Sequence, residues 1–82
     1  MASLNLEFVP ETPLQGFLWR LWRRQSEIVD ERELYRVVNE ILPEMAESLK
    51  DYLGKKYPTT VHRVVRDIAK NMDGRPWKGP GR

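Results

Sequence analysis

The 82-residue chain has no cysteine, one histidine and no glycine-rich phosphate-binding loop. The lack of cysteine excludes disulfides and thiolate zinc sites. A lone histidine without a serine or cysteine nucleophile near it gives no catalytic pair, so we expect a non-enzyme that uses no cofactor and no metal. The chain also lacks an apolar run long enough to cross a bilayer and a start typical of a signal peptide. We therefore expect an intracellular, cytoplasmic protein that does not bind membranes.

Basic and acidic side chains are nearly balanced over the whole chain but not along it. Lysine and arginine number 14, aspartate and glutamate number 12, and the net charge at pH 7 is +2. Residues 1–29 are neutral, residues 30–52 carry a net charge of −4, and residues 53–82 carry +6. The length allows one small domain, which we expect to span residues 1–82. Its last third is strongly basic, which predicts a polyanionic partner there.

The first eleven residues have the pattern of an extended arm. Leu4, Leu6 and Phe8 alternate with polar residues until Pro10, and no second strand pattern follows. A single strand leaves backbone groups unpaired. We therefore expect residues 1–11 to lie across the helices or to pair with a second chain.

Residues 12–26 have the spacing of a first helix. Thr12 is a suitable N-cap, and Pro13 takes the first helical position, where its missing N–H costs nothing. The apolar side chains of this segment cover an arc of about 200°, which is wider than a helix lying on one core normally shows. Part of this arc is therefore expected to remain available to a partner.

Residues 30–53 have the clearest helical pattern. The start is marked by an N-cap with a capping box and by a hydrophobic staple, which pair Asp30 with Glu33 and Val29 with Leu34. Pro43 interrupts the segment, but the apolar phase continues through it, so we expect one bent helix. Gly54 is suited to end it.

Residues 59–72 form the third expected helix, with Thr59 or Thr60 as its cap and a regular inward stripe of valines. Residues 73–82 contain prolines and glycines without periodicity, which predicts an irregular basic tail. The sequence thus predicts an all-α fold: a small three-helix bundle with an N-terminal extended arm and a C-terminal tail.

The outer face of the third expected helix is the strongest candidate for binding nucleic acid. With Val61 as the origin of a helical wheel, Arg66, Lys70 and Arg63 fall between about 140° and 200°, directly opposite the valines. A solvated face, with Asp67 pairing with Arg63 or Lys70, is the alternative. The candidate residues are Thr59, Thr60, His62, Arg63, Arg66, Lys70, Arg75, Lys78 and Arg82.

The sequence Leu-Gly at residues 53–54 followed by Thr-Thr-Val-His-Arg-Val at residues 59–64 resembles the turn and recognition helix of helix-turn-helix DNA-binding proteins. The resemblance covers about twenty residues. It implies that Thr59, Thr60, His62, Arg63 and Arg66 reach base edges in the major groove. The interval from Gly54 to Thr60 is about one residue longer than in that family.

The order of strand and helices is also similar to that of ribbon-helix-helix repressors, in which two chains pair their N-terminal strands and insert them into the major groove. In this chain the outward positions would be Ser3, Asn5 and Glu7. A carboxylate facing phosphates is unfavourable, so this resemblance ranks below the helix-turn-helix one.

A second candidate surface combines tryptophan and arginine, the side chains enriched at interface hot spots. Trp19 lies farthest from the centre of the apolar arc of residues 12–26, and Trp77 has no helical partner spacing in the tail. Both could instead belong to the core. The candidate protein-binding residues are Trp19, Trp22, Arg20, Arg23 and Trp77.

Two functions remain open from the sequence. The first is a small regulatory or structural protein that binds DNA or RNA through the basic last third. The second is an accessory, adaptor or inhibitory subunit that binds a larger protein through residues 12–26 and Trp77. The expected partners are accordingly a nucleic acid or an acidic protein surface, with a homodimer or a larger protein complex as possible assemblies.

Overall fold

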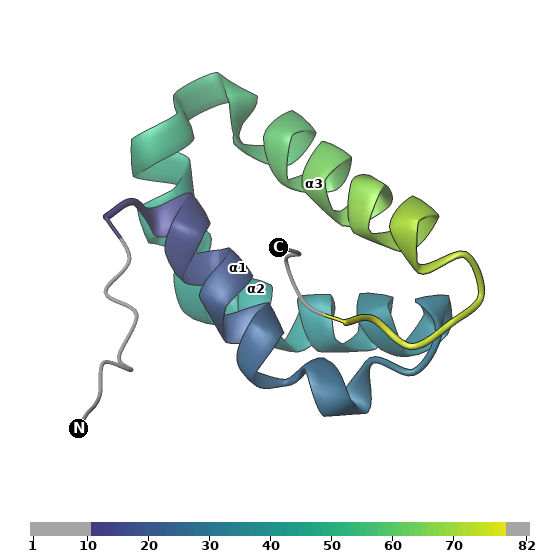
Figure 1. Cartoon of the computed structure of the whole chain (residues 1–82). Helices are drawn as coiled ribbons and strands as arrows, with labels where there is room; N and C mark the ends of the chain where they lie inside the picture. The colour runs from purple at the N-terminus through teal and green to yellow at the C-terminus, as the bar shows by residue number, and fades with distance from the viewer. Residues whose placement is uncertain (1–10, 79–82) are drawn as a thin grey trace.

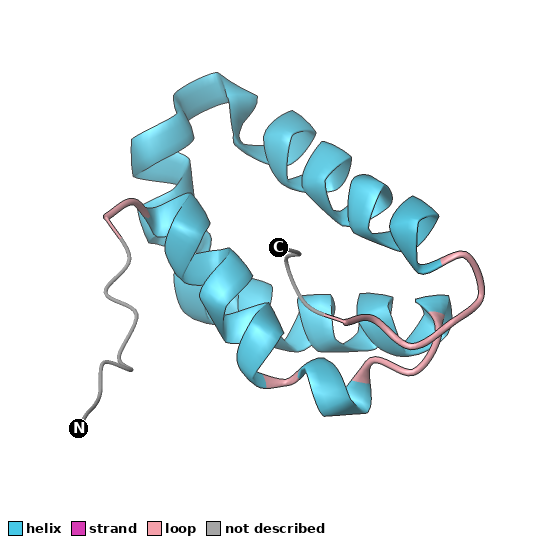
Figure 2. Cartoon of the chain, in the orientation of Figure 1, coloured by secondary structure: helices cyan, strands magenta, loops and turns pink. Residues whose placement is uncertain are grey.

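The computed structural model describes residues 11–78, and over this range every regular element is helical. The order is α1 (Pro13–Arg23), a 3₁₀ turn (Gln25–Glu27), α2 (Glu31–Leu53), a second 3₁₀ turn (Gly54–Lys56) and α3 (Tyr57–Met72). Figure 2 shows the helices in cyan, with no strand among the described residues. The all-α prediction is confirmed for these residues. Of the extended arm predicted at residues 1–11, only Glu11 lies within the described residues.

The start of α1 is the predicted one, and its end is earlier than predicted. The Thr12 hydroxyl accepts a hydrogen bond from the backbone N–H of Gln15 at 3.1 Å. The helix ends at Arg23 instead of continuing to residue 26, because the chain tightens into the 3₁₀ turn. This turn delivers Ile28, which is fully buried, to the core.

The prediction of one long helix through Pro43 is confirmed by α2. The Asp30 side chain caps it, accepting from the Glu33 N–H at 2.9 Å. The Glu33 carboxylate does not complete the capping box, since it accepts from Arg36 Nε at 2.6 Å. The predicted staple residue Val29 is half exposed, and its neighbour Ile28 is buried instead.

The start of α3 was wrongly predicted at the two threonines. The helix begins at Tyr57, directly after the 3₁₀ turn, so Thr59 and Thr60 lie inside its first turns and no side chain caps it. Pro58 is tolerated there because the first N–H groups of a helix have no intrahelical acceptor. Gly54 has the positive φ of 59° expected of a terminator.

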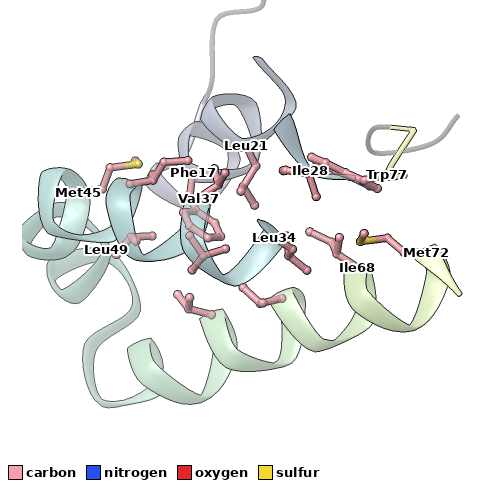
Figure 3. Close-up of a cluster of buried hydrophobic side chains, with 14 residues drawn as sticks. Phe17, Leu21, Ile28, Leu34, Val37, Met45, Leu49, Ile68, Met72 and Trp77 are labelled. Carbon is pink, nitrogen blue, oxygen red and sulfur yellow. The ribbon is translucent and has the colours of Figure 1, made fainter. Parts of the chain in front are cut away.

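The core lies where α2 packs against both α1 and α3 (Figure 1). Figure 3 shows its side chains converging from all three helices. The buried members are Phe17, Leu21, Ile28, Leu34, Val37, Val38, Ile41, Met45, Leu49, Val61, Val65, Ile68, Met72 and Trp77. Between residues 11 and 78, no helix combines the length and the apolar content that crossing a membrane would need.

The segment that follows α3 is irregular, as predicted, but as far as Lys78 it is not a loose tail. Asp73 and Gly74 turn the chain with positive φ angles of 51° and 77°. The backbone N–H of Trp77 then donates to the Ile28 carbonyl at 3.0 Å. The Trp77 side chain is only 8% exposed and lies beside Ile28 in Figure 3. This segment therefore ties the end of the described chain to the connection between α1 and α2.

Candidate nucleic-acid interface

Ion pairs connect α1 to α2 and neutralise much of the acidic face of α2. Within residues 11–78, every pair between a basic side chain and a carboxylate involves Arg20, Arg24 or Arg36. The pairs are Arg20–Glu44, Arg24–Glu27, Arg24–Glu40, Arg36–Glu27, Arg36–Glu33 and Arg36–Glu40, at 2.6–3.4 Å. All of these ion pairs join side chains of α1, α2 and the turn between the two helices.

The electrostatics of this network follow from the shared carboxylates. The hydrogen bonds from Arg24 lower the pKa of Glu27 from 4.5 to about 2 and also lower the pKa of Glu40. In turn, the Glu33 and Glu40 carboxylates raise the pKa of Arg36. These groups are therefore charged and mutually compensated at neutral pH. No cluster of three or more His, Cys, Asp or Glu side chains in the described range is placed to hold a metal ion.

The basic side chains on the outer face of α3, in contrast, are not neutralised by carboxylates of the described chain. We call Arg63, Arg66 and Lys70 the basic stripe; all three are exposed, and none pairs with a carboxylate of residues 11–78. The alternative in which Asp67 neutralises Arg63 or Lys70 is thus not the arrangement found. Arg66 Nη2 lies 3.4 Å from His62 Nε2, a contact between two residues one turn apart. The stripe is a set of uncompensated cations along about 10 Å of helix axis.

Two of the other predicted contact residues lie on the same face as the stripe, and one does not. Thr59 is exposed at about 160° on the wheel, close to Arg66 and Lys70, and His62 lies at its edge. Thr60 is half-buried at about 260°, on the other flank of the helix. Thr60 is therefore poorly placed to join a ligand that lies on the stripe.

The basic residues of the predicted tail do not extend the stripe. Arg75 and Lys78 are exposed, but they line a groove of about 540 Å³ whose wall includes Asp67 and the buried Trp77. We call this groove the Trp77 groove. Arg82 lies outside the described residues. The stripe lies on the outer face of α3 and the Trp77 groove lies on one flank of that helix. The single surface that was predicted from the third helix and the tail is therefore divided, because the chain turns back after Met72.

The tryptophans of α1 stack on each other. The rings of Trp19 and Trp22 have centroids 5.0 Å apart and an interplanar angle of 21°. Trp22, at 37% exposure, is more accessible than the half-buried Trp19, although the sequence favoured Trp19. Arg20 and Arg23 are exposed beside them, and with Trp19 they line a hollow of about 490 Å³.

Trp77 is not available as a protein-binding anchor in this arrangement. Its backbone bond to Ile28 and the burial of its ring place it in the core. Of the two alternatives that the sequence left open for Trp77, the structure shows the one in which it folds back onto the helices.

A second, smaller hollow flanks α3 on the side of Arg66. It has a volume of about 280 Å³ and lies between α2 and α3. Tyr35 and Asn39 line it from α2, and Tyr57 and His62 line it from α3. We call it the Tyr35 pocket. The helical spacing of α2 puts Tyr35 only at the edge of the apolar face of that helix. The wall that Tyr35 shares with residues of α3 depends on how α2 and α3 pack.

No protein-family model matches the chain, and comparison with curated proteins and with solved structures found no match.

Proposed function

We propose that this chain is a small, non-catalytic nucleic-acid-binding protein that holds phosphates on the basic stripe of α3. The proposal rests above all on one observation. Arg20, Arg24 and Arg36 are satisfied by carboxylates of the same chain, whereas the stripe is exposed without such a partner in the described residues. Cations left uncompensated in this way favour a polyanion as their partner.

The spacing of the stripe suits a run of phosphates. Arg63, Arg66 and Lys70 are spread over about 10 Å of helix axis. Three cations on this length can contact up to three phosphates of one strand. The Arg side chains can each bind a phosphate in bidentate fashion. Of the base contacts that the helix-turn-helix resemblance implies, Thr59 and His62 lie on the same face as the stripe, and recognition of base edges by these two would be a further property of the same helix.

The test compares two double variants that remove equal charge. Arg63→Gln with Arg66→Gln removes two cations of the stripe, and Arg20→Gln with Arg23→Gln removes two cations of α1. Binding of labelled DNA and RNA is measured by fluorescence anisotropy. For three contacts, the wild-type affinity is expected to fall about twenty- to fortyfold between 50 and 200 mM salt.

The stripe variant is expected to weaken binding and to flatten the salt dependence, with a change in the log–log slope of about 1.4–1.8. The α1 variant should leave both nearly unchanged. Equal losses in the two variants would show that only net charge matters, and no binding by wild type at 50 mM salt would overturn the proposal.

One observation favours the alternative of an accessory, adaptor or inhibitory subunit. Trp22 is 37% exposed and stacks on Trp19, so a large aromatic surface of α1 is open. Such surfaces commonly anchor protein partners. If the alternative holds, the wild-type chain captures one protein partner stoichiometrically, and nuclease treatment does not release it. Trp22→Ala will abolish this capture, whereas the variant with Arg63→Gln and Arg66→Gln will still capture the partner.

A further inference from the structure

The Tyr35 pocket has the composition of a site for a flat aromatic ring. Tyr35 and Tyr57 contribute aromatic side chains from two different helices, and Val61 and Val65 contribute apolar surface. Tyr35 is 37% exposed, so its ring is accessible to a ligand. A planar base stacks favourably on such side chains, whichever of the bases it is.

Polar groups at the same pocket can meet the edge of a base. The Asn39 side chain offers an amide, which carries both hydrogen-bond donors and an acceptor, and His62 offers a ring nitrogen. Both residues are exposed on the surface around the hollow. An apolar cavity with a few such groups is the usual composition of a small-ligand site.

The pocket adjoins the basic stripe through His62. His62 lines the pocket and is in contact with Arg66 of the stripe at 3.4 Å. The Trp77 groove also carries two cations, Arg75 and Lys78, but on the side that faces the stripe its wall is Asp67, whose carboxylate disfavours a phosphate. A strand whose phosphate lies on Arg66 can therefore turn its base toward Tyr35.

We propose that the Tyr35 pocket takes one unpaired base of a single-stranded nucleic acid whose phosphates lie on the basic stripe. This inference rests on the proposed function and narrows it to single strands. In a duplex, each base is stacked and paired, and moving it into a protein pocket first requires that this stacking and pairing be broken. A single strand avoids that cost.

The experiment compares two fluorescently labelled DNA oligonucleotides of equal length, oligo(dT) and an abasic strand with the same number of phosphates. The protein variants are Tyr35→Ala and a matched control, Tyr52→Ala, which removes a tyrosine of the same helix that is 52% exposed and does not line the pocket. Tyr35→Phe, which keeps the stacking ring, is the conservative variant. Far-UV circular dichroism and urea midpoints verify the fold of each.

Tyr35→Ala is expected to weaken binding of oligo(dT) at least fivefold, because a stacked base contributes about that much or more. Tyr35→Ala should leave the affinity for the abasic strand unchanged. Tyr52→Ala and Tyr35→Phe should bind both strands with the affinities of wild type. Wild type should also bind oligo(dT) at least fivefold more tightly than the abasic strand.

Equal binding of the two strands, unchanged by Tyr35→Ala, would overturn the base pocket and leave phosphate binding by the stripe intact. Binding of neither strand at low salt would overturn the proposed function and the pocket with it. Tighter binding of a duplex, independent of Tyr35, would also contradict the inference.

A second measurement uses the unaltered chain and so does not depend on the folding of a variant. Oligo(dT) carrying 5-iododeoxyuridine is irradiated in the complex, and the crosslinked residue is identified by mass spectrometry. Crosslinks at Tyr35, Tyr57 or His62 support the pocket. A crosslink confined to Tyr52 or Trp22 overturns it.

Discussion

At the scale of single residues, the stability of this domain depends on a small set of fully buried side chains. Phe17, Leu21, Ile28 and Leu34 are 0% exposed and belong to one cluster. In a chain of this size the net free energy of folding is only several kcal/mol. One large cavity in this cluster therefore removes a substantial part of the free energy of folding.

We expect Leu34→Ala to lower the free energy of unfolding by about 2–5 kcal/mol, because the lost apolar contacts leave a cavity. Val29→Ala, at a half-exposed position five residues earlier, should change it by less than about 0.5 kcal/mol. Urea denaturation followed by circular dichroism measures both values. A loss at Leu34 no larger than that at Val29 would contradict the assignment of the core.

Glu27 gives a prediction for the dependence of stability on pH. Arg24 lowers its folded-state pKa from 4.5 to about 2, so the carboxylate favours the folded state at neutral pH. This contribution is complete above the unfolded-state pKa and is lost as the pH falls toward 2. The difference in urea midpoint between wild type and Glu27→Gln should therefore be constant from pH 7 to about pH 5 and vanish near pH 2.

The ion pair between Arg24 and Glu27 is exposed, so added salt should reduce the difference in urea midpoint between wild type and Glu27→Gln at pH 7. A difference that persists unchanged at pH 2 would show that the Glu27→Gln substitution acts through something other than the lost charge.

At the scale of the helices, the ends are set by local groups that the sequence displays. Thr12 and Asp30 each accept a hydrogen bond from an N–H three residues later, and both were predicted as caps. The start of α3 could not be predicted in this way, because no side chain caps it. It is continuous with the 3₁₀ turn before it, and nothing local to Thr59 or Thr60 marks that continuity.

Removing the α2 cap tests this account. Asp30→Ala is expected to lower the free energy of unfolding by about 0.5–2 kcal/mol, because the Glu33 N–H loses its acceptor. Asp30→Asn keeps a side-chain oxygen and should stay close to wild type. Thermal and urea unfolding measure the difference, and equal losses in both variants would assign the effect to charge instead of capping.

At the scale of the whole molecule, the segment after α3 acts as a brace between distant parts of the chain. Trp77 hydrogen-bonds to Ile28 and packs in the same buried cluster as Met72. Contacts between residues so far apart in sequence hold the end of the described chain against the connection between α1 and α2 (Figure 1).

We expect Trp77→Ala to lower the free energy of unfolding by about 3 kcal/mol or more, the usual range for a buried aromatic side chain. Lys78→Ala, at the exposed neighbour, should change it by less than about 0.5 kcal/mol. A Trp77→Ala chain as stable as wild type in urea would show that the segment does not brace the fold.

The sequence alone determined the presence and order of α1, α2 and α3, two of their caps and the basic stripe. Each of these depends on relations within one helix, where 3.6 residues per turn place Arg63, Arg66 and Lys70 on one face whatever the rest of the chain does. Only the tertiary structure decided that Trp77 is buried, that Arg24 and Arg36 share carboxylates, and that Tyr35 and His62 line one pocket. These relations join different elements, so they depend on how helices pack and where the chain turns back, and no spacing along the sequence encodes them.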